Sequence, residues 1–252
     1  MLLEDKVGII TGGAKGIGKA ICELFNLEGA YLSIVDIAFD EAKKVAEEIS
    51  NKTGRRCIAI SANVSKKAEV EKMVKNTVEY FGKVDILVNN AGILIHKFFL
   101  EMSEEDWDNI ISVNLKSVFL CSQAVAREMI KQKSGKIINV SSLSAKKPTI
   151  KEAAYSASKA GILGLNRVMA LELGRYGINV NAICPGFTET EMSRKAWLTK
   201  PDVINEWIDK TALKKIGKPE DQAKVALFLA SHLSDYITGE AIIVSAGEVM
   251  GQ

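Results

Sequence analysis

Short apolar segments alternate with helix-type segments along almost the whole chain, and this alternation limits the possible folds more than any other feature. The apolar segments lie at residues 6–11, 31–36, 57–61, 84–88, 135–140, 178–184 and 241–244. Helical periodicity occurs between them at residues 16–28, 41–52, 66–81, 103–132 and 153–176, and Pro219 begins a further helix. Strands separated by helices run parallel, and apolar strands in such sheets are buried on both faces. The pattern predicts an α/β fold, a doubly wound parallel sheet of about seven strands with helices on both faces.

The domain organisation follows from the continuity of this pattern. No segment rich in Pro, Gly or Ser divides the chain, so we expect residues 1–252 to form a single domain. Residues 187–217 fit the alternation poorly. We interpret them as a substrate-covering flap with short helices, one of them expected at residues 197–211.

Charge and residue counts argue against several classes of protein. The 33 basic and 31 acidic residues give a net charge of +2, so neither nucleic acid nor a membrane surface is expected as a partner. No apolar run approaches the roughly 20 residues of a membrane span, and no signal-peptide pattern is present, so we expect a cytoplasmic protein. Four cysteines without a C-x-x-C pair and only two histidines predict no metal site.

A glycine-rich loop separates the first predicted strand from the first predicted helix, with the sequence Thr11-Gly12-Gly13-Ala14-Lys15-Gly16-Ile17-Gly18. Glycines at this position permit a tight turn and let backbone N–H groups approach a pyrophosphate at a helix N-terminus. The loop therefore predicts a dinucleotide site that uses Gly12, Lys15, Gly16, Ile17 and Gly18.

Asp36 ends the second predicted strand and bears on the choice of cofactor. It lies close to the offset of roughly 20 residues expected for a carboxylate that binds the adenosine ribose diol. Such a carboxylate would repel a 2′-phosphate by about 4 kcal/mol at an effective dielectric constant of about 20. Lys15 could pair with that phosphate, but an exposed lysine contributes only about 0–1 kcal/mol. We therefore expect NAD, and NADP less readily.

Tyr155 and Lys159 lie four residues apart in a predicted helix and so share one helix face. A nearby ammonium, together with a positive nicotinamide ring, would favour the phenolate and lower the pKa of Tyr155. The phenol could then take a hydroxyl proton as a hydride leaves carbon. Such a pair is common by chance, so its meaning depends on the motifs around it.

Further motifs occur in a fixed order: Asn89-Asn90-Ala91-Gly92, Asn114, Ser142 before Tyr155, and Pro185-Gly186. Together with the glycine loop and Lys159, they resemble the single-domain short-chain dehydrogenase/reductase family over essentially the full length. The resemblance implies a Rossmann fold and hydride transfer between a nicotinamide dinucleotide and an alcohol or carbonyl substrate.

The same resemblance assigns roles to individual residues. It implies that Tyr155 is the acid/base, that Ser142 stabilises the developing alkoxide, that Lys159 binds the nicotinamide ribose, and that Asn114 holds a water for proton relay. Alone, Asn114 would be interpreted as a helix residue bonded to backbone. The other cofactor-binding residues that it implies are Asn90, Gly92, Pro185, Gly186, Thr188 and Thr190.

Two segments depart from the family pattern. Asn63-Val64 stands where the family often has Asp-Val, and the Asn63 amide oxygen could still accept a hydrogen bond from the adenine amino group. Ser245-Ala246-Gly247 stands where Asp-Gly-Gly is expected, which leaves the geometry of the terminal loop open.

Three segments, residues 94–98, 144–152 and 187–211, are expected to line the substrate pocket. Lysines 146, 147 and 151 could attract an anionic substrate, although we favour solvated loop charges. His96, in the first of these segments, is interpreted as a pocket-wall or surface residue and not as the catalytic base, because Tyr155 already fills the role of the base. The predicted pocket residues are Leu94, His96, Ser144, Phe187, Met192 and Trp197.

The helix at residues 153–174 is nearly free of charge, with only Lys159, Arg167 and Glu172. A helix that is apolar on most sides is buried on most sides, so we expect a homo-oligomer, a dimer or tetramer.

The leading functional hypothesis is an NAD-dependent dehydrogenase of a secondary alcohol, such as a sugar, polyol, steroid or small hydroxy compound. The alternative is an NADPH-dependent 3-oxoacyl-thioester reductase of acyl carrier protein, which Asp36 disfavours and Lys15 favours. A third hypothesis, a dinucleotide sensor without catalysis, has no need of the aligned Ser142, Tyr155 and Lys159.

Overall fold

The computed structural model describes residues 1–196 and 201–250, and within them seven strands form one parallel sheet. The strand order is β3-β2-β1-β4-β5-β6-β7, and every neighbouring pair runs parallel. The order reverses between β1 and β4, which creates a crevice at the carboxyl ends of these two strands. The predicted doubly wound sheet is therefore confirmed. The strands are β1 (Val7–Thr11), β2 (Tyr31–Asp36), β3 (Cys57–Ser61), β4 (Ile86–Asn89), β5 (Gly135–Val140), β6 (Ile178–Pro185) and β7 (Ala241–Val244).

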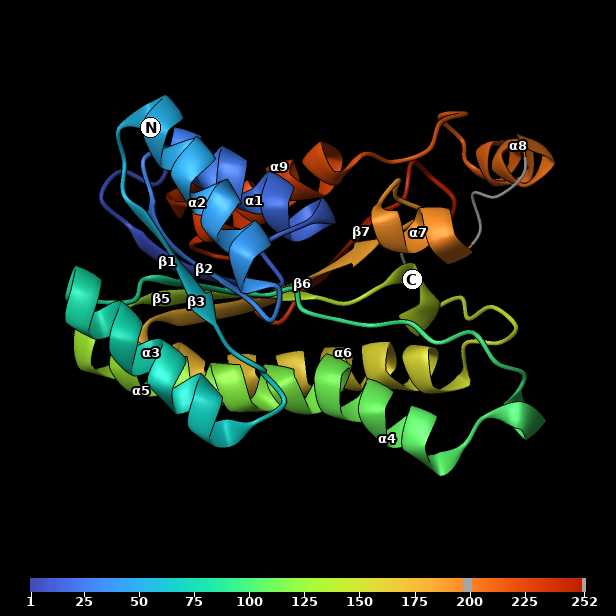
Figure 1. Cartoon of the computed structure of the whole chain (residues 1–252), viewed down its shortest axis with the longest axis horizontal. Coiled ribbons are helices and arrows are strands. Elements are labelled where there is room, and N and C mark those ends of the chain that lie inside the picture. The colour runs from blue at the N-terminus through green and yellow to red at the C-terminus, as the bar shows by residue number, and fades with distance from the viewer. Residues whose placement is uncertain (197–200, 251–252) are drawn as a thin grey trace.

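Helices cover both faces of this sheet, as Figure 1 shows. On one face lie α1 (Gly16–Leu27), α2 (Phe39–Thr53) and α9 (Pro219–Ala230). On the other face lie α3 (Lys67–Phe81), α5 (Ser117–Gln132) and α6 (Ala153–Leu173). None of the helices in the described part of the chain has the length and hydropathy that a membrane crossing requires.

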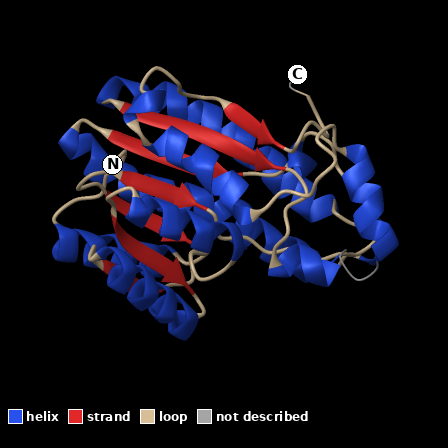
Figure 2. Ribbon diagram, turned by 90° about the horizontal axis from the view of Figure 1, so that it is seen from above, coloured by secondary structure: helices blue, strands red, loops and turns tan. Residues whose placement is uncertain are grey.

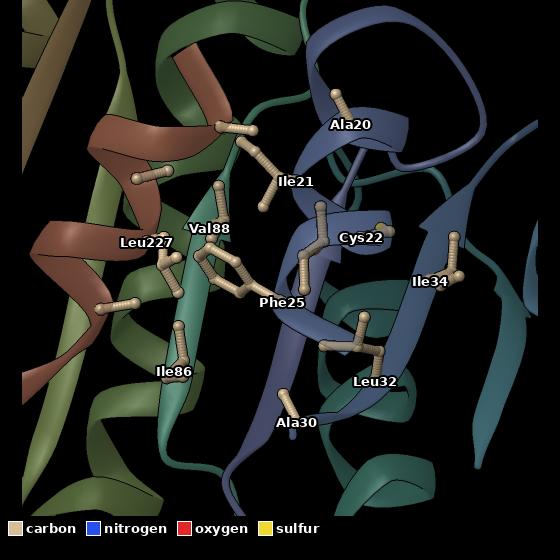
Figure 3. Packing of buried hydrophobic residues seen from close by; sticks show 14 of the residues in the cluster. Ala20, Ile21, Cys22, Phe25, Ala30, Leu32, Ile34, Ile86, Val88 and Leu227 are labelled. Carbon is tan, nitrogen blue, oxygen red and sulfur yellow. The ribbon is translucent and has the colours of Figure 1, made fainter. Parts of the chain in front are cut away.

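The core beneath α1 shows why this helix packs as it does. Its buried residues Ile21 and Phe25 recur at helical spacing on the face that meets the sheet. Phe25 is fully buried and points towards Ile86 and Val88 of β4 and Leu227 of α9 (Figure 3). Burial of such a side chain contributes about 1.5–3 kcal/mol, so this contact fixes the glycine loop at the start of α1 against the sheet.

The predicted long helix at residues 103–132 is interrupted. It consists of α4 (Glu104–Ile111), a π-helical turn (Ser112–Lys116) and α5. Such turns are frequent at functional sites, and this one contains Asn114. Periodicity could not reveal it, because one extra residue in a turn changes the apolar spacing very little.

The flap (residues 187–217) contains α7 (Glu191–Ala196) and α8 (Pro201–Lys210). A parallel bridge between Thr188 and Gly217 joins the two ends of the flap. The helix predicted at residues 197–211 corresponds to α8, while residues 197–200 lie outside the described part. In Figure 2 the strand arrowheads all point to the side where these helices lie, so the flap stands at the carboxyl edge of the sheet.

Candidate active site

The carboxyl edge of the sheet opens onto a cavity of about 890 Å³. That size lies within the range of about 300–1,000 Å³ typical of ligand pockets. The predicted site residues that line it are Gly12, Lys15, Gly16, Ile17, Asp36, Asn63, Val64, Asn90, Gly92, Leu94, Ser142, Ser144, Tyr155, Lys159, Pro185, Gly186, Phe187, Thr188, Thr190 and Met192.

Three predicted residues are placed differently, and a fourth is not among the described residues. Gly18, His96 and Asn114 do not line the cavity, and Trp197 lies outside the described residues. Gly18 supports the site from behind, because a Cβ there would collide with the carbonyl oxygen of Gly12. The third glycine of the loop therefore permits close packing of α1 against the loop rather than contact with a ligand.

The glycine loop forms a cradle at the N-terminus of α1. Gly12 and Gly16 have φ angles of +63° and +54°, which disfavour other residues. A Cβ at Gly12 would lie 2.9 Å from Ala91 Cα. The first turn of α1 contains no acidic residue, and the N-cap residue Lys15 makes no side-chain capping bond within the described chain. These features fit a pyrophosphate group.

Thr11, a residue to which sequence reasoning gave no role, ties this loop to β4. Its Oγ1 accepts hydrogen bonds from the backbone N–H groups of Asn90 (3.0 Å) and Ala91 (3.1 Å). The Asn90 amide in turn donates to the carbonyl oxygens of Thr11 (3.1 Å) and Gly12 (2.9 Å). Asn90 therefore stabilises the cradle by binding the backbone carbonyl groups of the glycine loop.

Asp36 lies at the end of β2, where a ribose carboxylate is expected. Its two oxygens accept from the backbone N–H groups of Ala14 (3.2 Å) and Ala38 (3.0 Å), which hold the side chain at the cavity wall. Lys15 is already engaged by two carboxylates, Glu41 at 2.8 Å and Glu191 at 3.3 Å. Hydrogen bonds to Glu41 and then Glu191 raise the pKa of Lys15. The positive charge of Lys15 is therefore already neutralised by two carboxylates of the protein.

Asn63 differs from its predicted use. Its Oδ1 accepts from the Ser65 N–H (3.1 Å) and the Ser65 hydroxyl (2.7 Å), so it closes a local turn. The amide oxygen expected to accept from adenine is thus already used by the protein, although Asn63 lines the cavity.

The cavity wall near the carboxyl end of β5 contains Ser142, Tyr155 and Lys159. Ser142 follows this strand, is 9% exposed, and its Oγ accepts from the Ser144 N–H at 3.1 Å. Lys159 is buried in α6, donates from Nζ to the Val140 carbonyl oxygen at 2.8 Å, and lies 5.6 Å from the centre of the Tyr155 ring. The arrangement places a hydroxyl donor, a phenol and an ammonium around one point.

In the protein without a bound cofactor, burial sets the pKa of the Tyr155 phenol, and the predicted lowering by Lys159 together with a positive nicotinamide ring stays a prediction. Burial raises the pKa of Tyr155 to about 12, a hydrogen bond with Ser142 opposes the rise, and the charge of Glu152 adds to it. Burial also lowers the pKa of Lys159 to about 8. The reason is desolvation, which disfavours both charged forms, while the ammonium is directed at the Val140 carbonyl.

Asn114 joins the π-helical turn to the segment after β4. It is fully buried; its Oδ1 accepts from the Ile93 N–H (2.8 Å), and its Nδ2 donates to the Ile93 carbonyl oxygen (2.9 Å) and Ser158 Oγ (3.2 Å). A Cβ at Gly92 would lie 3.4 Å from Asn114 Oδ1 and 3.6 Å from Lys159 Nζ. Asn114 thereby positions the backbone beside Lys159.

The predicted pocket residue Phe187 lies in the cavity beside residues that were not predicted as site residues. Phe187 stacks on Trp207 at 4.4 Å between ring centres, and both line the cavity. Glu152, Lys147 and Glu248 also line it. Glu152 lies within the segment at residues 144–152, which was predicted to line the pocket. Glu248 follows β7, and its place in the cavity depends on where β7 lies in the sheet, which no local sequence pattern indicates. The described residues contain no group of three or more His, Cys, Asp or Glu placed to hold a metal ion.

Comparisons with known proteins agree with this geometry. A family model described as Enoyl-(Acyl carrier protein) reductase matches residues 12–248. The chain is 41% identical over 251 residues to 3-oxoacyl-[acyl-carrier-protein] reductase FabG of Thermotoga maritima, covering 99% of this chain and 100% of that protein. It is 39% identical over 246 residues to NAD-dependent glycerol dehydrogenase of Listeria innocua, covering 97% of this chain and 94% of that protein.

Solved structures give the same result. The crystal structure of levodione reductase matches with a TM-score of 0.94 at 32% identity, covering 98% of both chains. Sequence, fold and site geometry agree over nearly the full length, and the chain belongs to the short-chain dehydrogenase/reductase family of NAD(P)-dependent oxidoreductases that act on CH–OH groups.

Proposed function

We propose that the protein transfers a hydride between NAD(H) and a secondary alcohol or the corresponding ketone, with Tyr155 as the acid/base. The observation that carries the proposal is that Asp36 and the group Ser142, Tyr155 and Lys159 line one cavity. When bound, the nicotinamide dinucleotide supplies or accepts the hydride. The protein residues are left to bind the substrate oxygen and to move its proton.

Each catalytic side chain has a distinct part in the oxidation direction. The Ser142 hydroxyl donates a hydrogen bond to the substrate oxygen and stabilises the negative charge that develops on it. The Tyr155 oxygen takes the hydroxyl proton, which requires its phenolate form. Because the protein groups favour the neutral phenol, the ammonium of Lys159 and the positive charge of the oxidised cofactor must stabilise that phenolate.

The preference for NAD rests on Asp36. At about 4 Å and an effective dielectric constant of about 20, the repulsion of a 2′-phosphate is about 4 kcal/mol, and partial exposure reduces it. Lys15 offers little compensation, because Glu41 and Glu191 already bind it. We therefore expect a higher kcat/KM with NAD than with NADP. Asp36→Asn should raise the NADP:NAD ratio of kcat/KM by about 10- to 100-fold.

The matched control is Asp40→Asn, which removes one charge at an exposed position of α2 outside the cavity and should leave this ratio unchanged. A wild-type protein that already prefers NADP would contradict the assignment.

An NADPH-dependent 3-oxoacyl-thioester reductase is the second candidate. The relative of Thermotoga maritima and the description of the matching family model favour it. Asp36 and the carboxylate-bound Lys15 disfavour it. Nicotinamide absorbance with secondary alcohols and with an acetoacetyl thioester, each tested with both cofactors, separates the two candidates.

We further propose that the flap covers the substrate and that the protein is a homodimer or homotetramer. Three flap residues, Phe187, Met192 and Trp207, line the cavity, which supports the proposal that the flap covers the substrate.

The proposed oligomer rests on α6. Its residues Leu171 and Val168 are 84% and 51% exposed, so this apolar helix has a face that a second copy would cover. Light scattering should give a mass of at least two chains, and a monomeric mass would refute the oligomer.

A further inference from the structure

We propose that the substrate is a neutral polyhydroxylated carbon chain whose hydroxyl groups donate to the carboxylates Glu152 and Glu248. This inference rests on the proposed function, because the reacting hydroxyl is placed at Ser142 and Tyr155. It narrows the substrate class through residues that take no part in proton transfer.

Two carboxylates in the cavity wall are almost completely buried. The side chains of Glu152 and Glu248 are 2% and 3% exposed, and both residues line the cavity. Oε2 of each finds no hydrogen-bond partner among the described residues. A buried polar atom without a partner is costly, and native proteins leave few of them. Each oxygen therefore has unused acceptor capacity, which a ligand hydroxyl can satisfy when the carboxylate that lines the cavity turns towards it.

The remaining oxygens of these carboxylates have protein partners. Glu152 Oε1 lies 3.5 Å from His96 Nε2, and Glu248 Oε1 lies 3.4 Å from Lys147 Nζ. Burial raises the pKa of Glu152, while the Ser144 hydroxyl and then the charge of His96 oppose the rise. His96, predicted as a pocket residue, therefore acts behind Glu152 instead of lining the cavity itself.

The charges in this part of the cavity disfavour an anionic substrate. Of the three lysines that could attract an anion, only Lys147 lines the cavity, and Glu248 already pairs with it. A carboxylate or phosphate would therefore face two protein carboxylates and one neutralised lysine. A neutral substrate avoids this repulsion.

Hydroxyl groups are the donors that match these acceptors. An ionised carboxylate only accepts hydrogen bonds, and charge-assisted bonds from hydroxyl groups are strong. A 3-oxoacyl chain presents methylene and carbonyl groups here, which would leave both oxygens without a donor. A simple secondary alcohol has only the reacting hydroxyl. A polyol supplies additional hydroxyls beside the reacting one.

The test compares kcat/KM for NAD-linked oxidation of xylitol, D-xylonate and 2-butanol. Xylonate carries a carboxylate where xylitol carries a terminal hydroxymethyl group. The wild type should prefer xylitol by at least about 100-fold over 2-butanol and about tenfold over xylonate. Because one charged hydrogen bond contributes about 1.5–3 kcal/mol, Glu152→Gln and Glu248→Gln should each lower the xylitol:2-butanol ratio at least about tenfold.

Both substitutions should also raise the xylonate:xylitol ratio, since they remove a repelling charge, and this relative gain cannot arise from poor folding. The control is Glu47→Gln, an exposed carboxylate of α2 that does not line the cavity, which should change neither ratio. Titration of NADH fluorescence checks that the variants bind the cofactor as the wild type does.

Ratios that are unchanged in both variants, or a wild-type preference for xylonate or 2-butanol, overturn the inference and leave the NAD-linked alcohol dehydrogenase intact. NADPH-linked reduction of an acetoacetyl thioester without NAD-linked oxidation of any probe overturns the proposed function, and this inference with it. If none of the substrates turns over, saturation-transfer NMR on the NADH complex decides, and absence of xylitol binding overturns the inference.

Discussion

Replacement of Lys159 by Met should make the pH dependence of stability differ from that of the wild type in a defined way. Lys159 is 4% exposed, and its ammonium has one described hydrogen-bond partner, the Val140 carbonyl oxygen. Burial lowers its pKa from 10.5 to about 8. Below about pH 8 the folded protein therefore keeps a buried charge that the unfolded chain holds in water.

The expected size follows from proton linkage. One pKa unit corresponds to about 1.4 kcal/mol, so the fall from 10.5 to about 8 corresponds to a penalty of about 3 kcal/mol at neutral pH. Between about pH 8 and 10.5 the unfolded state binds more protons than the folded state, so wild-type stability rises with pH through Lys159. Lys159→Met lacks this contribution. By about pH 9.5 the wild type should gain about 2 kcal/mol relative to the variant.

Urea unfolding at a fixed protein concentration, at about pH 7 and pH 9.5, measures this difference. Lys44→Met, at an exposed position of α2, removes one lysine from solvent and should give a curve parallel to the wild type. Other titrating groups occur in all three proteins and cancel in the comparison. Parallel curves for the wild type and Lys159→Met would show that the ammonium is not desolvated and would refute the reasoning.

Two further substitutions test the site. Tyr155→Phe should lower kcat by at least about 1,000-fold while the Kd for NADH changes less than about twofold, because it removes the acid/base and little else; near-normal turnover would refute the role. Asn114→Leu should lower the free energy of unfolding by about 2–4 kcal/mol, since the buried N–H and carbonyl of Ile93 lose their partners. A loss under about 0.5 kcal/mol in urea unfolding would contradict that account.

The sheet was predictable because its signals are local. Each strand is a short apolar run, each crossover is a helix, and a parallel sheet is the arrangement that such a chain can form. The glycine loop was predictable for the same reason, since its conformation depends on Gly12 and Gly16 and on their place between β1 and α1. The edge of the sheet that carries the site followed from the topology.

What the sequence could not show depends on contacts between distant segments. Glu248 pairs with Lys147 across 101 positions of the chain, and Asn114 bonds to Ile93 across 21. The engagement of Lys15 by Glu41 and Glu191 requires α2 and α7 to meet at the glycine loop. The desolvation that raises the pKa of Tyr155 in the cofactor-free protein also arises from distant segments, whereas the Tyr155–Lys159 pair is visible in the sequence.

Charged side chains are buried at the carboxyl edge of the sheet, where the proposed active site lies. Their desolvation lowers the stability of the folded protein. Lys159, Glu152 and Glu248 are all nearly inaccessible to solvent, and two of them keep an oxygen without a partner among the described residues. Apolar residues of similar volume would avoid this desolvation penalty. The chain instead holds Lys159 within α6, Glu152 directly before it and Glu248 in the segment after β7. In the proposed function, the unmet hydrogen-bonding capacity of Glu152 and Glu248 is free energy that the substrate recovers on binding, which would tie the affinity of the site to the stability that folding gives up.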